Sequence, residues 1–127
     1  MLRLDWVGPL CLCASEVDRV PRGVAGVYLL HAFAAPLGSY PVFYVGRSCD
    51  LQRRLHQHLA DAAAKPSVRL FRRFAPAYFS AAVVLQQALL DRIESGLIRG
   101  LRPPCNGQIP TAAPLLVSLP PLRAHVP

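Results

Sequence analysis

The sequence predicts an α+β domain, similar to an α/β sandwich, in which a small three-stranded antiparallel sheet is flanked by α-helices. Three segments rich in β-branched and aromatic residues indicate the strands, and two segments with apolar residues every three or four positions indicate the main helices. The expected strands cover 23–33, 42–46 and 77–85, and the expected helices cover 51–64 and 86–101. A chain of 127 residues has the size of one domain with one core.

The first two strands are expected to form a hairpin. The segment "GVAGVYLLHAF" follows a proline, and "VFYVG" ends at Gly46. Between them, "AAPLGSYP" has the composition of a loop. Strands joined by such a loop pair in antiparallel fashion, but the sequence does not fix their register. Whether Tyr28 and Tyr44 share one face of the sheet therefore stays open.

The first main helix is indicated by Leu51, Leu55 and Leu59, which recur every four residues. Asp50 precedes them and is a suitable N-cap, because its side chain can accept a hydrogen bond from the first turn. We expect this helix to reach about Ala64.

Two further segments complete the domain. Residues 67–74 can form a short helix or turn that directs basic charge outward, and the helix over 86–101 is ended by "RPP". The predicted organisation is an irregular N-terminal lead-in at 1–22, which can add an edge segment, a domain at 23–107 and a proline- and leucine-rich C-terminal tail at 108–127. The leucines of the tail can pack over an edge of the domain.

The composition argues against membrane, disulfide and zinc classes. No apolar run approaches the roughly 20 residues that span a bilayer. The four cysteines lack the paired spacing of structural zinc sites, and the first residues do not form a signal peptide. We expect reduced thiols and a cytoplasmic protein.

The charge points to a polyanionic partner. The formal net charge is +7 and the pI is about 9.9. Phosphate-rich partners therefore rank first and anionic membrane surfaces second. A solvated basic face without a partner is the competing interpretation. The charge is concentrated in seven basic residues, which are the candidate nucleic-acid contacts: Arg47, Arg53, Arg54, Lys65, Arg69, Arg72 and Arg73.

Polar residues interrupt the apolar stripes of both main helices. At 100° per residue, Arg54 and His58 fall on or beside the leucine stripe of the first helix. Glu94 falls within the stripe of the second helix. Each has a structural explanation: an ion pair for Arg54, a backbone carbonyl partner for His58, and an arginine partner, Arg54 or Arg47, for Glu94.

Together these residues also suggest one polar cleft beside the hairpin. A carboxylate can hold a divalent cation, and an arginine can bind a phosphate oxygen. These are the parts of metal-assisted phosphodiester hydrolysis. Tyrosine hydroxyls on the hairpin can position or deprotonate a water molecule.

The motifs "GVY" (26–28), "YVGR" (44–47), "DLQRRLHQH" (50–58), Glu94 and "RPPCN" (102–106) resemble, in this order, the GIY-YIG nuclease superfamily. The likeness is closest to small standalone members and to the N-terminal incision domain of the bacterial excision-repair nuclease. It covers residues 24 to about 107, and it implies a small antiparallel sheet flanked by helices.

The resemblance also implies residue roles. Glu94 would ligate one Mg²⁺ or Mn²⁺, and Arg54 would contact the scissile phosphate. Tyr28 would act as general base or orient the attacking water, and Tyr44 would help to hold the water and the phosphate. Arg47, a position where relatives often have lysine, would lower the pKa of Tyr28. His58 would assist the reaction, and Asn106 would brace the site by hydrogen bonds.

The expected function is a divalent-metal-dependent endonuclease that hydrolyses DNA and leaves a 5′-phosphate and a 3′-hydroxyl. Its substrate would be duplex or branched DNA in repair, recombination or mobile-element processing. The chain departs from the family in its long linker between the two tyrosines and in lacking an appended DNA-binding module. A homodimer or a protein partner would then supply specificity. The alternative is a nucleic-acid-binding module, or a partner-dependent subunit, that keeps a nuclease fold without cutting.

Overall fold

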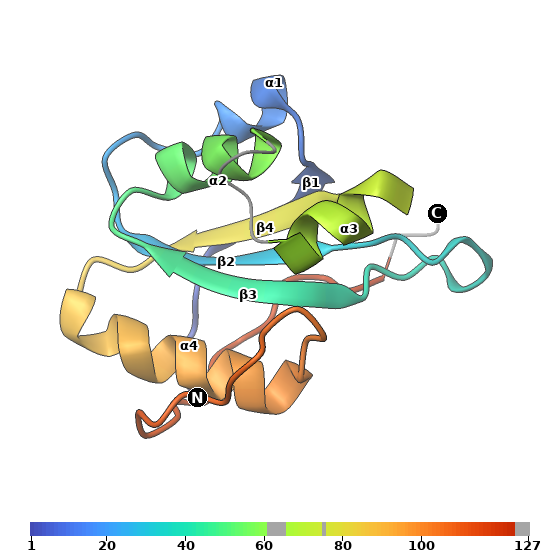
Figure 1. Ribbon diagram of the computed structural model, residues 1–127. Coiled ribbons are helices and arrows are strands. Elements are labelled where there is room, and N and C mark those ends of the chain that lie inside the picture. The colour runs from blue at the N-terminus through green and yellow to red at the C-terminus, as the bar shows by residue number, and fades with distance from the viewer. Residues whose placement is uncertain (61–65, 75, 124–127) are drawn as a thin grey trace.

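The computed structural model describes residues 1–60, 66–74 and 76–123 of the chain. A four-stranded antiparallel sheet forms its centre, with helices on both faces (Figure 1). The strands are β1 (Trp6–Cys11), β2 (Gly26–His31), β3 (Val42–Ser48) and β4 (Tyr78–Val83), in the spatial order β1-β4-β2-β3. The helices are α1 (Ala14–Val17), α2 (Leu51–Leu59), α3 (Pro66–Phe74) and α4 (Gln87–Leu101), with a short 3₁₀ helix η1 (Ala35–Leu37).

The hairpin register decides which way the tyrosines point. Tyr28 lies opposite Gly46, and Leu30 lies opposite Tyr44. Because directly opposed residues share a face and side chains alternate along a strand, Tyr28 and Tyr44 project from the same face of the sheet. We call this the tyrosine face, and the opposite side the α4 face.

Each face is covered by its own hydrophobic core. On the tyrosine face, Tyr28 and Leu30 of β2 pack with Leu51 and Leu55 of α2 and with Val68 of α3. On the α4 face, the apolar side of α4 packs on the alternate residues of β2, β3 and β4 (Figure 1). The two main helices therefore lie on opposite faces of one sheet, and β3 is the edge strand on which both layers border.

Three features differ from the sequence-based expectation. The sheet has four strands where three are expected, because β1 pairs with β4. The segment 1–22, expected to be an irregular lead-in that can add an edge segment, supplies the edge strand β1 and also α1. A Gly-Pro pair interrupts the strand composition of β1 and hides it in the sequence. Helix α2 ends at Leu59, whereas its predicted end, Ala64, lies outside the described residues.

The C-terminal segment packs against the α4 face. Leu115 and Val117 join the core there, and the Trp6 indole donates a hydrogen bond to the Ser118 carbonyl at 2.8 Å. Gly96 allows the close approach, since a Cβ at this position would lie 1.9 Å from the Leu115 carbonyl oxygen. The domain boundaries at 23–107 and 108–127 stay a prediction. Among the described helices, none has both the length and the apolar character that a membrane crossing requires.

Candidate active site at the edge strand β3

A cluster of aromatic and basic side chains lies on the tyrosine face. The Tyr28 hydroxyl is 2.8 Å from Nε2 of His58. The Tyr44 ring lies beside both, with centroid distances of 6.1 Å to Tyr28 and 5.7 Å to His58. Tyr28 and His58 are buried, whereas Tyr44 is partly exposed. The accessible side of the cluster is therefore the Tyr44 side.

Local sequence explains why this cluster forms. Gly46 lies opposite Tyr28, and a Cβ there would be 2.2 Å from Cζ of the Tyr28 ring. Only glycine leaves room for the ring to lie across β3. The Asp50 side chain accepts a hydrogen bond from the Arg53 amide at 3.2 Å and so caps α2. This start sets the turn of α2 that directs His58 at Tyr28.

The cluster is uncharged at its centre. Burial, followed by the neighbouring Tyr44, raises the pKa of Tyr28 above its ordinary value of 10, and the Arg54 guanidinium opposes the rise. Burial and the positive charges of Arg54 and Arg72 lower the pKa of His58 to about 4. At neutral pH a phenol therefore faces a neutral imidazole, and the pair can exchange a proton without creating a lasting buried charge.

The hydrogen-bond partners of His58 and Arg54 differ from the backbone carbonyl and the ion pair that would give these residues a purely structural role. The backbone carbonyl partner expected for the His58 ring is absent from the described residues. Its Nε2 faces Tyr28, and its buried Nδ1 has no hydrogen-bond partner there. Arg54 donates to Gln57 Oε1 at 3.1 Å, while the Asp50 side chain is used as the cap of α2. Arg54 is therefore held near Tyr28 by a neutral partner, and no carboxylate pairs with it among the described residues.

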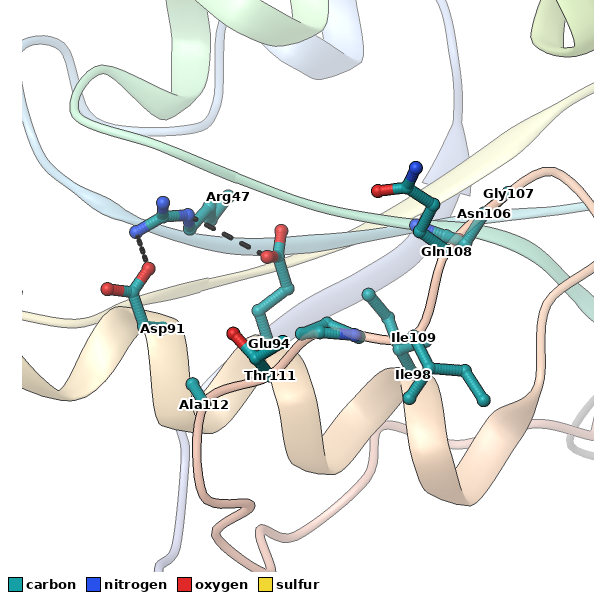
Figure 2. A pocket seen from close by; sticks show the side chains of 11 residues that line it. Arg47, Asp91, Glu94, Ile98, Asn106, Gly107, Gln108, Ile109, Thr111 and Ala112 are labelled. Carbon is teal, nitrogen blue, oxygen red and sulfur yellow. Dashed lines mark ion pairs between the residues drawn. The ribbon is translucent and has the colours of Figure 1, made fainter.

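The α4 face carries a separate cavity of about 860 Å³ below β3. Figure 2 shows Glu94 rising from α4 into it, with Arg47 and Asp91 on one side and Asn106 on the other. The Arg47 Nε lies 3.7 Å from Glu94 Oε1, and Arg47 Nη1 contacts Asp91 Oδ1. Burial raises the pKa of Glu94, Arg47 opposes this, and Asp91 adds to it.

Asn106 binds the free edge of β3. Its Oδ1 accepts from the Val45 amide and its Nδ2 donates to the Val45 carbonyl, both at 2.8 Å. One residue earlier, the Cys105 amide donates to the Phe43 carbonyl at 2.9 Å. The "PPCN" segment thus satisfies the edge where an unpaired strand would otherwise attract another chain. That Asn106 braces the site stays a prediction of the resemblance.

The structure divides the predicted residues into two groups. Tyr28, Tyr44, Arg54 and His58 lie on the tyrosine face, whereas Arg47, Glu94 and Asn106 line the cavity on the α4 face. Arg54 and Glu94, which are expected to line one cleft, therefore lie on opposite faces of the sheet. The two groups border the same strand, since Tyr44 and Arg47 are both on β3.

One expected interaction has a different partner. The resemblance implies that Arg47 lowers the pKa of Tyr28, but the cation that acts on Tyr28 is Arg54. Arg47 faces the other side of the sheet because it stands an odd number of residues from Tyr44. Its charge acts on Glu94 instead.

The cavity fits a small hard cation. No group of three or more His, Cys, Asp or Glu side chains that can hold a metal occurs among the described residues. Magnesium does not require such a cage, since it commonly keeps several waters and uses one or two carboxylates plus phosphate oxygens. Glu94 offers one half-buried carboxylate in a cavity with room for water and phosphate oxygens.

Apart from Arg47 on β3, the candidate nucleic-acid contacts that the structure describes lie on α2 and α3 of the tyrosine face. Arg53 on α2 and Arg69 on α3 are exposed, and Arg72 is partly buried and donates to the His58 carbonyl. Lys65 and the side chain of Arg73 lie outside the described part of the chain.

Sequence reasoning missed a second basic region, a hollow of about 450 Å³ that borders the Glu94 cavity. It is lined by Arg99 and Arg102, and it shares Ile98, Asn106 and Ile109 with the larger cavity. Arg102 ends α4 in a left-handed conformation with φ 47°. The sequence contains a signal for this basic region, because Arg99 and Arg102 stand at the C-terminal end of the helix, about two turns after Glu94.

Solved structures with this architecture identify the fold. The GIY-YIG N-terminal endonuclease domain of UvrC from Thermotoga maritima, as a point mutant bound to its catalytic divalent cation, superposes with a TM-score of 0.56. The fold is that of a GIY-YIG nuclease domain. The match covers 73% of this chain and 97% of that domain at 19% sequence identity. The same UvrC domain bound to magnesium matches with a TM-score of 0.54 at 20% identity, covering 72% of this chain and 96% of that one.

No protein-family model and no curated protein sequence matches the chain. At this level of identity the likeness to UvrC establishes the GIY-YIG fold, and the roles of individual residues rest on the geometry above.

Proposed function

We propose that the chain is a divalent-metal-dependent endonuclease that hydrolyses DNA phosphodiester bonds and leaves a 5′-phosphate and a 3′-hydroxyl. One observation carries the proposal. In a GIY-YIG fold, a neutral Tyr28–His58 pair beside Arg54 and a half-buried carboxylate, Glu94, border the two sides of one edge strand. A proton acceptor, a phosphate-binding cation and a metal ligand are the groups that this reaction needs.

The tyrosine face supplies the proton path. Tyr44, at the rim, orients the attacking water, and the water gives a proton to the Tyr28 oxygen as Tyr28 passes its own proton to His58 Nε2. The water oxygen forms its bond to phosphorus while the bond from phosphorus to the 3′ oxygen breaks. The leaving oxygen takes a proton from solvent. Because both Tyr28 and His58 start neutral, the path needs no phenolate in the resting protein.

The charged residues supply binding and electrostatic stabilisation. Arg54 binds a non-bridging phosphate oxygen and stabilises the charge that develops on it. Glu94 holds the Mg²⁺ or Mn²⁺, which when bound acts as a Lewis acid toward the phosphate. Arg47 stays beside Glu94 and meets the substrate from the α4 face. Asn106 keeps β3 in place between the two groups.

DNA is the proposed substrate because the chain has a net charge of +7 and several of its arginines lie beside the site. Contacts from Arg53, Arg69 and Arg72 to the backbone would position the DNA without reading its sequence. Duplex or branched DNA, a role in repair, a homodimer or partner that supplies specificity and a cytoplasmic location all stay predictions.

The test is cleavage of end-labelled linear, nicked, flapped and four-way-junction DNA with Mg²⁺, Mn²⁺ or EDTA. The parent is compared with Glu94→Gln and with Glu16→Gln, which changes a carboxylate on the distant helix α1. We expect metal-dependent cutting that Glu94→Gln abolishes while DNA binding and the Glu16→Gln activity are retained. Undiminished cutting by Glu94→Gln would refute the assignment of the metal ligand.

A non-cleaving nucleic-acid-binding module is the second candidate, and two observations favour it. Tyr28 is only 1% exposed, and Glu94 already has a cationic neighbour in Arg47. Salt-sensitive DNA binding with no metal-dependent product on any of the four substrates would support this candidate.

A further inference from the structure

We propose that Asp91 is a positioning residue: it holds the Arg47 guanidinium at the mouth of the cavity and thereby leaves the Glu94 carboxylate open to a divalent cation. The inference rests on the proposed function only in taking Glu94 as the metal ligand. Asp91 itself needs no contact with metal or substrate.

The geometry of the three side chains is asymmetric. Arg47 Nη1 is in close contact with Asp91 Oδ1, whereas Arg47 Nε stays 3.7 Å from Glu94 Oε1 (Figure 2). Asp91 and Glu94 stand three residues apart on α4, so both carboxylates face β3 and compete for one guanidinium. The closer contact goes to Asp91.

The exposed fraction of the side chain falls from Asp91 to Arg47 to Glu94. The Asp91 side chain is 60% exposed, that of Arg47 44% and that of Glu94 22%. Arg47 is therefore drawn outward from the more buried carboxylate toward the more exposed one. A guanidinium carries several donors in a fixed planar fork, so an anchor on one edge also fixes where its other edge points.

Without the contact to Asp91, the Arg47 guanidinium would form two hydrogen bonds to the Glu94 carboxylate. A two-pronged pair between arginine and a carboxylate is the strongest arrangement open to these groups, and it would occupy the oxygens that bind a cation. Asp91 prevents this pairing by offering Arg47 a competing partner.

A purely structural role explains Asp91 less well. Within the described residues its side chain makes one ion pair, with Arg47, and no hydrogen bond to the backbone. Exposed ion pairs contribute little to stability. Asp91 variants should therefore fold, and their effects on cation binding can be measured directly.

The experiment is a double-mutant cycle on Mn²⁺ affinity, measured by electron paramagnetic resonance on the full chain without DNA. The four proteins are the parent, Asp91→Asn, Arg47→Gln and the double variant. We expect Asp91→Asn to weaken Mn²⁺ binding about tenfold, and Arg47→Gln to strengthen it. In the Arg47→Gln background the effect of Asp91→Asn should fall to about twofold, because only the loss of a nearby negative charge remains.

Two controls frame the cycle. Asp91→Glu should restore Mn²⁺ affinity, since a longer carboxylate can still hold Arg47. Asp18→Asn, which removes an aspartate of matching exposure (61%) elsewhere on the surface, should leave the affinity unchanged. An equal loss from Asp91→Asn in both backgrounds would show that Asp91 acts only through its charge or as a ligand, and would overturn the proposal.

A second measurement separates this inference from the proposed function. The ¹⁵N–¹H signal of Arg47 Nε should move in Asp91→Asn and return in Asp91→Glu, with no metal present. An unchanged signal in Asp91→Asn overturns the positioning role whatever the metal does. Mn²⁺ binding that survives Glu94→Gln would instead refute the metal site of the proposed function.

Discussion

Mild acid should destabilise the protein because two histidines are buried in neutral form. His58 faces Tyr28, and His31 lies between the Tyr40 carbonyl, 3.0 Å from Nδ1, and the Ser80 hydroxyl, 2.8 Å from Nε2. Both side chains have no exposed surface. Burial is the main cause that lowers the pKa of each from 6.5 to about 4.

The sign and size of the effect follow from these values. Between pH 6.5 and 4 the unfolded chain binds protons that the folded chain does not, so the free energy of unfolding falls as the pH falls. At pH 5.0, about 1.5 pH units below the ordinary value, the loss is about 2 kcal/mol per histidine and about 4 kcal/mol for both. Glu94 acts in the opposite sense, because burial raises its pKa, and offsets part of this loss. Typical domains have only 5–15 kcal/mol in total, so the change is large.

Urea unfolding followed by circular dichroism at pH 7.5, 6.5, 5.5 and 5.0 measures this loss. We expect His31→Gln and His58→Gln each to remove about half of the pH dependence, since glutamine hydrogen-bonds without titrating. A parent protein whose free energy of unfolding is the same at pH 7.5 and 5.0 would refute the reasoning. So would variants that keep the full slope.

Three further substitutions have defined outcomes. Gly46→Ala places a methyl group on the Tyr28 ring and should cost about 1–3 kcal/mol of unfolding free energy in urea melts, and it should lower cleavage even where the protein is folded. Asn106→Ala removes both bonds to Val45 and should cost about 1–3 kcal/mol, and Asn106→Asp, which sets a carboxylate oxygen against the Val45 carbonyl oxygen, should cost at least as much; a smaller loss from Asn106→Asp in the same melts would contradict this account. Arg102→Gln should reduce the salt dependence of DNA binding by about one phosphate contact in titrations at several salt concentrations, while Arg92→Gln, which changes an arginine bonded to the C-terminal segment, should not.

The sequence predicts most of the strands and helices, because these elements depend largely on residues that are close together in the chain. The strands at β2, β3 and β4 and the helices at α2 and α4 appear near their expected positions. The helical period also placed His58 and Glu94 among apolar neighbours, and both are buried or half-buried in the structure. A polar residue on an apolar stripe is visible in any single sequence, since it depends only on the geometry of its own helix.

The separation of the site into two groups was not predictable in the same way. A helical period states which side of α2 or α4 is buried, but not which face of the sheet that side covers. The face to which Tyr28 and Tyr44 point depends on the pairing of Tyr28 with Gly46, and a slip of one residue in this register would place the two tyrosines on opposite faces. Strand β1 depends on pairing with β4, as between Trp6 and Ala82, and the C-terminal segment depends on contacts between residues more than 100 positions apart, such as Trp6 with Ser118.

In the proposed reaction, the edge position of β3 allows residues on opposite faces of the sheet to act together. Consecutive side chains of a strand alternate between faces, so Tyr44 and Gly46 lie on the face of Tyr28 while Val45 and Arg47 lie on the face of Glu94. In the centre of a sheet these groups would be separated by neighbouring strands. At an edge, a phosphodiester group can approach the strand from the side and meet both sets, provided that the backbone of the edge does not pair with another strand. Asn106 and Cys105 satisfy this condition by occupying the hydrogen-bonding groups of Val45 and Phe43. The "PPCN" segment therefore closes this edge of β3 to pairing with a further strand.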